Sequence, residues 1–270
     1  MLSSAMRTAL EEAVSIRYML RALGIPVVKP TKVFGDNLLA SSRMPLSIRK
    51  ILEMAQLNQP IVAYNGGLIL SQIHADDTQE VIFDQAIEIP AARIIESLCQ
   101  ELGVHCSLYH ANDWFVSHDD FWSAREMKNT MLQPTDTSAL KEIEENFPHI
   151  KGFHKIMCMG EADKISRLEK LLHSQCAADV DVYRTKDTYL ELSPKGINKH
   201  TALMHICHYL GVSLSESIAI GDNHNDIDMV RHAGIGIAVQ NAVPELKAVA
   251  KHHTSSHLED GVALAVQRFF

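Results

Sequence analysis

The stretch that decides the fold runs Ser217-Ile218-Ala219-Ile220-Gly221-Asp222-Asn223-His224-Asn225-Asp226-Ile227-Asp228-Met229. Its apolar start, residues 218–220, is typical of a buried strand in a parallel sheet, and Gly221 ends that strand in a turn. Asp222 and Asp226 follow at the carboxyl end of the strand, which is the edge where open α/β sheets bind their ligands.

Two carboxylates in such a turn repel each other unless a cation lies between them. Mg²⁺ is held in proteins by one or two carboxylates together with water and phosphate oxygens. A turn that caps the next helix is the alternative, because Asp and Asn are both good N-caps. The stretch therefore indicates either a metal site or a helix cap at the edge of a parallel sheet.

Alternating strand-like and helix-like segments surround a middle of different character. Parallel strands are predicted at 60–64, 218–220 and 234–239, and we expect them in one sheet. The middle has short antiparallel strand patterns, with helices at 91–102 and 161–174. The sequence predicts an α/β, Rossmann-like core at 39–66 and 190–270 with an α+β cap domain inserted at 67–189, after an atypical segment at 1–38.

Several motifs, in the right order, resemble those of the Cof-type phosphatases of the haloacid dehalogenase-like (HAD) superfamily. They are Ala40-Ser41-Ser42-Arg43, Tyr64-Asn65-Gly66-Gly67, the stretch 193–203 around Lys199, and Gly221-Asp222 followed by Asn225-Asp226. Segments 241–247 and 259–262 also resemble the end of those proteins. The resemblance runs from about residue 38 to the end of the chain.

The resemblance implies hydrolysis of phosphate monoesters of small metabolites through an aspartyl-phosphate, with Mg²⁺ as cofactor. Asp222 would bind the Mg²⁺, and Asp226 would be a second or outer ligand. Lys199 would neutralise the phosphoryl group. Ser41, Ser42, Asn65 and Asn225 would line the phosphate site, with the Ser41 hydroxyl bonded to phosphate.

Each of these roles has a structural alternative. Lys199 could be a solvated lysine at the start of a helix. Ser41 could cap the helix before Pro45, and Asn65 could be a turn residue. Ser42 stands where those phosphatases have glycine, so it adds a side chain where the backbone usually approaches the ligand.

The first motif of those phosphatases, Asp-x-Asp-Gly-Thr, does not occur in the 270 residues. The chain has Asp-x-Asp at Asp179–Asp181, in the predicted cap, and at Asp226–Asp228, in the fourth motif. We therefore expect the first core strand and the nucleophile to be missing, and the phosphatase activity to be impaired. A non-catalytic protein that binds phosphorylated metabolites, or a chimeric or truncated gene product, are the alternatives.

Residues 7–38 resemble instead the ribonuclease H region of copia-type retrotransposon polyproteins, with Asp36 as one metal-binding carboxylate. Asp36 lies five positions before Ser41, which is about 16 Å along an extended strand. A nucleophile must come within about 3.5 Å of the phosphorus. Asp36 is therefore not expected to replace the missing nucleophile.

The net charge of −8 argues against nucleic acid as a partner, whereas a small phosphorylated metabolite needs only local positive groups. The five cysteines have no Cys-x-x-Cys spacing and are typical of free thiols in a reducing compartment. No signal peptide or membrane-spanning run is apparent, so a cytoplasmic location is expected. The histidines at 205, 208, 252 and 253 and the triplet His118-Asp119-Asp120 are interpreted as ordinary surface residues. The oligomeric state is not predicted.

Overall fold

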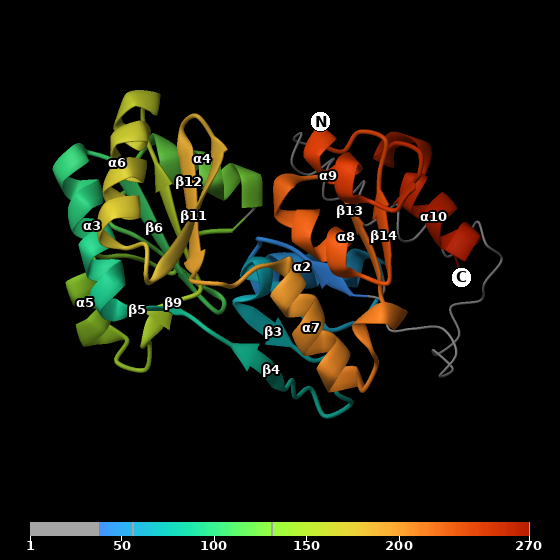
Figure 1. Cartoon of the computed structure of the whole chain (residues 1–270). Coiled ribbons are helices and arrows are strands. Elements are labelled where there is room, and N and C mark those ends of the chain that lie inside the picture. Colours follow the sequence, from blue (N-terminus) through green and yellow to red (C-terminus); the bar gives the residue numbers. More distant parts are fainter. Residues whose placement is uncertain (1–37, 56, 131, 270) are drawn as a thin grey trace.

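The computed structural model describes residues 38–55, 57–130 and 132–269. Nearly all of the atypical segment at 1–38, with the ribonuclease H-like stretch and Asp36, lies outside these residues. The described chain forms two lobes, a core and a cap (Figure 1). No described helix combines the length and the apolar character needed to cross a bilayer.

The first sheet of the core has the strand order β1-β2-β3-β4. Its strands are β1 (Leu39–Ala40), β2 (Ile61–Ala63), β3 (Leu68–Leu70) and β4 (Val81–Asp84). β1 and β2 are parallel and are connected by helix α2 (Pro45–Ala55). β3 and β4 continue the sheet in antiparallel pairing. Because β1 and β2 are parallel, their carboxyl ends lie at the same edge of this sheet. Strand β2 ends shortly before Asn65, as the strand predicted at 60–64 does.

The second sheet of the core is parallel and has the order β13-β14-β15. It consists of β13 (Ile218–Gly221), β14 (Ile235–Ala238) and β15 (His252–His253), with helices α8 (Ile227–His232), α9 (Pro244–Val249) and α10 (Gly261–Phe269). Short 3₁₀ turns lie at η2 (Leu214–Glu216), η3 (His224–Asp226) and η4 (His257–Glu259). Residues 218–220 therefore form the predicted parallel strand, but only Ala219 of the strand is buried, and Ile218 and Ile220 are half-buried.

In the part of the chain that the structure describes, 60–64 and 218–220 do not share one sheet, contrary to the prediction. β2 and β13 belong to different sheets, and within the described residues β1 and β13 are both edge strands. Helix α7 (Lys199–Leu210) connects the two sheets instead. Its Ala202 and Ile206 pack with Val62 and Ile69, whereas its Leu203 and Cys207 pack with the second sheet.

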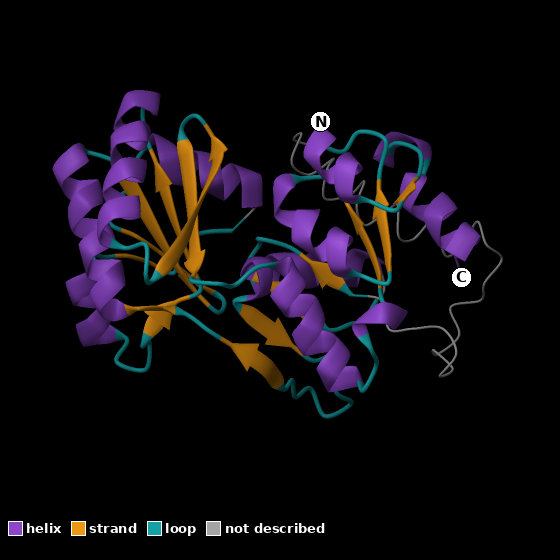
Figure 2. Ribbon diagram, viewed as in Figure 1, coloured by secondary structure: helices purple, strands orange, loops and turns teal. Residues whose placement is uncertain are grey.

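The cap is built on a six-stranded sheet of order β11-β12-β10-β6-β7-β8. The strands are β6 (His105–His110), β7 (Asp113–Val116), β8 (Asp136–Thr137), β10 (Lys155–Met159), β11 (Val180–Lys186) and β12 (Tyr189–Pro194). A small pair, β5 (Ile87–Glu88) and β9 (Gly152–Phe153), lies beside it. Helices α3 (Ile89–Leu102), α5 (Leu140–Asn146) and α6 (Ala162–Gln175) cover one face, and α4 (Phe121–Thr130) follows β7 (Figure 2).

The strand pairings differ from the boundaries expected for the inserted cap domain. β3 and β4 fall within the predicted cap, 67–189, yet they hydrogen-bond to β2 in the core sheet. β12 extends to Pro194, and it pairs with cap strands although 190–194 were assigned to the core. Turn residues Asn65-Gly66-Gly67 suggested a domain border, but here they join two strands of one hairpin.

An apolar cluster joins the two lobes, and we call it the interlobe cluster. Its core members include Ile48, Leu52 and Tyr64, and its cap members include Tyr109 and Trp114. The rings of Tyr109 and Trp114 are stacked, with their centroids 5.8 Å apart. The hydroxyl of Tyr64 donates to the carbonyl oxygen of Ala111 in the β6–β7 turn at 2.7 Å. The cap is thereby packed directly over the carboxyl ends of β1 and β2.

Candidate active site

Asp226 is buried and organises the turn after β13. Its Oδ2 accepts hydrogen bonds from the backbone N–H groups of Asp222 and Asn223, both at 3.1 Å. Its Oδ1 accepts from Nζ of Lys199 at 2.6 Å. Gly221 permits this arrangement, because a Cβ at that position would lie 2.4 Å from Cβ of Asp226. Both Asp226 oxygens are engaged, so this side chain positions the turn.

Lys199 is the first residue of α7, where the side chain of Asn198 caps the helix by accepting from the N–H groups of His200 and Thr201. Lys199 is 8% exposed, so it is not the solvated lysine of the structural alternative. Its ammonium group carries three N–H donors, and the bond to Asp226 occupies one of them. Among residues 38–55, 57–130 and 132–269 the other two have no hydrogen-bond partner, so they could bind a phosphate oxygen.

Asp222 is only partly exposed and lies beside the buried Asp226. Partial burial, and then the negative charge of Asp226, raise the pKa of the Asp222 carboxyl group. A divalent cation would relieve this repulsion, and one carboxylate with water and phosphate oxygens is a donor set that suits Mg²⁺. The residues present therefore fit Mg²⁺ at Asp222, with Asp226 behind it.

Asn65 connects the two sheets and the cap. Its Oδ1 accepts from Nδ2 of Asn225 at 3.1 Å, and its Nδ2 donates to Oε1 of Glu191 at 2.8 Å. The turn that carries it is unusual, since Tyr64, Asn65 and Gly66 all have positive φ values. The structure thus brings Asn65 and Asn225 together, although they are 160 residues apart in sequence.

Ser41 follows β1 and is held by its backbone. The N–H of Ser41 donates to the carbonyl oxygen of Val62 at 2.9 Å. The carbonyl oxygen of Ser41 accepts from the N–H of Asn65, also at 2.9 Å. Oγ of Ser41 accepts from the N–H of Arg43 at 3.2 Å, a local turn bond two residues before α2 begins at Pro45 and not a cap of that helix. The hydroxyl proton remains available to a ligand. Ser42 contributes its carbonyl oxygen, which accepts from Nζ of Lys155 at 3.2 Å.

Two cap residues, Glu191 and Lys155, belong to this region and were not predicted from the sequence. Glu191 is 6% exposed, and burial raises the pKa of its carboxyl group. Nζ of Lys155 lies 4.4 Å from the centroid of the Tyr109 ring. A signal was present, because Glu191 interrupts the apolar run Tyr189-Leu190-Glu191-Leu192 with a charge.

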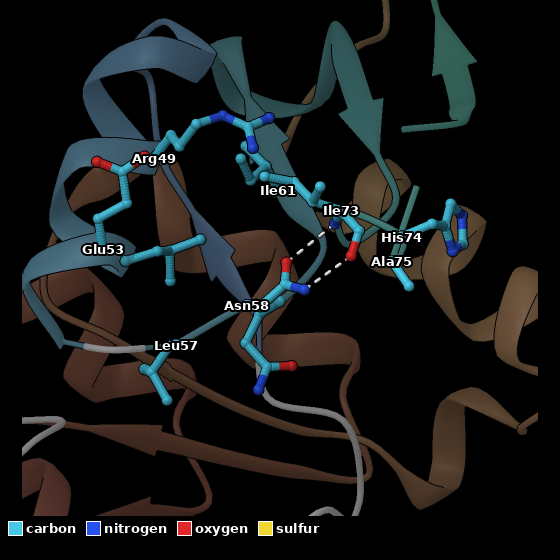
Figure 3. A pocket seen from close by; sticks show the side chains of 10 residues that line it. Arg49, Glu53, Leu57, Asn58, Ile61, Ile73, His74 and Ala75 are labelled. Carbon is cyan, nitrogen blue, oxygen red and sulfur yellow. Dashed lines mark hydrogen bonds between the residues drawn. The ribbon is translucent and has the colours of Figure 1, made fainter. Parts of the chain in front are cut away.

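A pocket of about 480 Å³ lies at the opposite end of β2 (Figure 3). Arg49, Asn58, Ile61 and His74 are among the residues that line it. Asn58 is fixed there by two hydrogen bonds to the backbone of Ile73. Since Ile61 begins β2, the pocket is at the amino end of this strand. It is therefore separate from the site around Lys199, Asp222 and Asp226.

Comparison with known proteins identifies the family of the chain. Residues 35–266 match the family model of the haloacid dehalogenase-like hydrolases. A putative phosphatase of Haemophilus influenzae is 32% identical over 237 residues, which cover 85% of this chain and 83% of that protein. The 5-amino-6-(5-phospho-D-ribitylamino)uracil phosphatase YitU of Bacillus subtilis is 23% identical over 222 residues, or 81% of this chain and 78% of that one.

Solved structures show the same fold. A haloacid dehalogenase-like hydrolase from Bacteroides thetaiotaomicron superposes with a TM-score of 0.78 at 23% identity, covering 100% of this chain and 95% of that one. The family match, the curated relatives and the fold agree with the order of the sequence motifs. The chain therefore belongs to the haloacid dehalogenase-like hydrolases.

Proposed function

We propose that the protein binds the phosphate group of a small phosphorylated metabolite between core and cap, with Mg²⁺ at Asp222. The observation that carries this proposal is the buried pair of Lys199 and Asp226 directly behind Asp222. A buried ammonium group with free donors, next to a partly exposed carboxylate, offers both charges that a phosphate–Mg²⁺ pair requires.

Several side chains would complete this phosphate site. Asn225 and the hydroxyl groups of Ser41 and Ser42 supply neutral donors, and Asn65 holds Asn225 in place. Mg²⁺, when bound, would supply positive charge to the phosphate oxygens. The YitU relative and an HMP-PP phosphatase of Yersinia enterocolitica carry names of phosphatases with small phosphorylated substrates. Those names support a substrate of the same class here.

We also propose that this 270-residue chain releases phosphate slowly or not at all. Transfer of a phosphoryl group to an aspartate requires a carboxylate in line with the phosphorus, and no Asp-x-Asp-Gly-Thr motif occurs in the sequence. Phosphate binding would depend on other residues, among them Lys199 and Asn225. A non-catalytic binding protein is therefore the second candidate function. A chimeric or truncated gene product would explain genetically why the chain is an impaired phosphatase or only a binding protein.

The decisive experiment measures binding and turnover separately on the purified chain. We expect inorganic phosphate with Mg²⁺ to bind in calorimetry, and we expect p-nitrophenyl phosphate to be hydrolysed below about 10⁻³ s⁻¹, against a typical enzyme turnover of about 10 s⁻¹. Asp222→Ala should abolish the Mg²⁺-dependent part of phosphate binding. Asp228→Ala is the matched control, because Asp228 is half exposed and pairs with Arg231 on the surface.

Ordinary turnover that disappears in the Asp222→Ala protein would show that the chain contains a nucleophile, and it would overturn the proposed impairment. Absence of both phosphate binding and turnover would overturn the proposed site itself. Genomic sequence upstream of the reading frame separates the genetic explanations, because an adjacent segment that encodes Asp-x-Asp-Gly-Thr would indicate a truncated gene.

We also propose that the protein is cytoplasmic and that it does not bind nucleic acid. The net charge of −8 supports a protein that does not bind nucleic acid. Five cysteines, all free and buried, support a reducing compartment such as the cytoplasm.

A further inference from the structure

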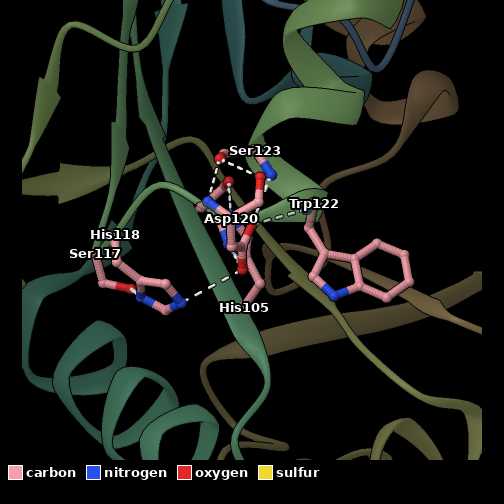
Figure 4. A network of polar contacts seen from close by, with 7 residues as sticks. His105, Ser117, His118, Asp120, Trp122 and Ser123 are labelled. Carbon is pink, nitrogen blue, oxygen red and sulfur yellow. Dashed lines mark hydrogen bonds and ion pairs between the residues drawn. The ribbon is translucent and has the colours of Figure 1, made fainter.

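A second group of polar side chains lies in the cap (Figure 4). His105 begins β6, and His118 and Asp120 lie in the loop between β7 and α4. The β6–β7 turn at Ala111 touches the core, and His105 is six residues before it, about 20 Å along the strand. This group is therefore separate from the candidate active site.

Three potential ligand atoms of this group face one another. His105, His118 and Asp120 each offer one such atom, and the three atoms lie within 4.8 Å of one another. Oδ2 of Asp120 is 3.0 Å from Nδ1 of His105 and 3.3 Å from Nε2 of His118. The three atoms thus surround a single point.

The opposite atom of each side chain has a partner that fixes its orientation. Nε2 of His105 is 2.9 Å from Oγ of Ser107, and Nδ1 of His118 is 2.9 Å from Oγ of Ser117. Oδ1 of Asp120 accepts from the N–H groups of Trp122 and Ser123 at 2.8 and 2.9 Å. Outer hydrogen bonds of this kind orient the ligands of protein metal sites.

The three side chains differ in how far they are exposed to solvent. The side chain of His105 is fully buried, that of Asp120 is 23% exposed and that of His118 is 60% exposed. One side of the group is therefore enclosed by the cap sheet, and the other is open to solvent. A metal ion could enter from the open side and keep a water molecule there.

We propose that His105, His118 and Asp120 form a binding site for a divalent cation of the Zn²⁺ class. Three protein ligands with two imidazoles and one carboxylate, plus water, is a known Zn²⁺ arrangement. Mg²⁺ and Ca²⁺ prefer oxygen ligands alone, so they are not suited to this site. The site adds a metal to the cap and is independent of Mg²⁺ at Asp222.

Calorimetry of the full chain with Zn²⁺ tests the proposal, in excess Mg²⁺ so that oxygen-only sites are occupied. Asp120→Asn is the sharpest variant, because asparagine keeps the helix-capping oxygen and removes the anionic ligand. His118→Ala removes an exposed ring. His173→Ala is the matched control, since His173 is an exposed histidine of the same lobe.

We expect one equivalent of Zn²⁺ to bind the parent and the His173→Ala protein equally. Asp120→Asn and His118→Ala should each weaken binding by more than about 100-fold, and Ser107→Ala by about 10- to 100-fold. Equal Zn²⁺ affinity in the parent and both ligand variants would overturn the site, as would a parent that does not bind Zn²⁺ at millimolar concentration.

X-ray absorption of the Zn²⁺-loaded parent gives a second readout that needs no variant. We expect two imidazole nitrogens at about 2.0–2.1 Å from the ion. A shell of sulfur ligands at about 2.3 Å would overturn the proposal. It would place the ion instead at the buried thiols of Cys99, Cys106 and Cys158, which also lie within 4.8 Å of one another.

Discussion

At the scale of single residues, the ion pair of Lys199 and Asp226 combines a short distance with nearly complete burial. Replacing Lys199 by methionine leaves the carboxylate of Asp226 buried without its cation. Breaking a buried pair in this way costs about 3–5 kcal/mol. We expect Lys199→Met to lower the free energy of unfolding by that amount in urea titrations.

The chain provides a control for this prediction. Lys195 and Asp181 pair at 2.7 Å on the surface, with exposed fractions of 51% and 27%. Because exposed pairs contribute about 0–1 kcal/mol, Lys195→Met should have little effect. The double variant Lys199→Met/Asp226→Asn should recover part of the loss. Equal costs for the two lysines would contradict the importance of burial.

His154 predicts a dependence of stability on pH. Its Nδ1 accepts from the N–H of Ala111 at 3.1 Å, and its Nε2 is 3.0 Å from a carboxylate oxygen of Asp84. Burial, and then the nearby His110, lower the pKa of His154 to about 4. The unfolded chain, with a pKa near 6.5, therefore binds a proton that the folded chain does not bind between these values.

Stability from this group is accordingly present above about pH 6.5 and is lost as the pH falls toward 4. The expected loss between pH 7 and pH 5 is about 2 kcal/mol. In His154→Asn, the side-chain oxygen can replace Nδ1 as acceptor but does not titrate. Urea unfolding at both pH values should show a pH dependence smaller by about 2 kcal/mol. An unchanged dependence would contradict the assignment.

How far site residues can be predicted depends on whether they belong to a continuous motif. Asp222, Asp226 and Lys199 were found from their neighbours, and the structure brings them together. The separate roles of the two aspartates were not predictable, because they depend on which oxygens the backbone occupies. Glu191 and Lys155 reach the site from cap strands, and no local pattern encodes that approach.

At the scale of elements, the turn η1 (Tyr64–Gly66) brings β2 against the start of α7. Gly66 has a φ of 115°, and a Cβ there would lie 2.8 Å from Cβ of Ala202 and 3.1 Å from the carbonyl oxygen of Asn198. Only glycine meets both conditions without strain. α7 could not approach the turn this closely with any other residue.

We expect Gly66→Ala to lower the free energy of unfolding by more than about 2 kcal/mol, since backbone strain and a steric clash both contribute. Gly196→Ala separates the two effects. Gly196 also has a positive φ, 76°, but a Cβ there meets nothing within 4 Å. Similar losses in thermal or urea unfolding for the two variants would show that the contact with α7 is unimportant.

Elements with a strong local pattern were predicted well. The helices expected at 91–102 and 161–174 correspond to α3 and α6, and the antiparallel strand patterns expected in the middle of the chain include β6 and β7. Strand partners were harder. Leu68–Leu70 and Val81–Asp84 resemble cap strands locally, but hydrogen bonding to β2 places them in the core. Pairing is a long-range property that an apolar run does not specify.

At the scale of the whole molecule, the two lobes share the interlobe cluster. Its aromatic rings come from both sides, Tyr64 from the core and Tyr109 and Trp114 from the cap, and each is at most 2% exposed. Separating the lobes would expose these rings to water, at a cost of about 25 cal/mol per Å² of apolar surface. The polar bonds of Asn65 and Lys155 to the opposite lobe would also break.

Because of this shared interior, we expect the two lobes to unfold as one cooperative unit. Both tryptophans, Trp114 and Trp122, lie in the cap, and Trp114 is fully buried at the boundary. Its fluorescence reports on the boundary, whereas far-ultraviolet circular dichroism reports on all helices and strands. The two signals should follow one coincident transition. A fluorescence midpoint well below the dichroism midpoint would mean that the cap detaches first, as a folding unit of its own.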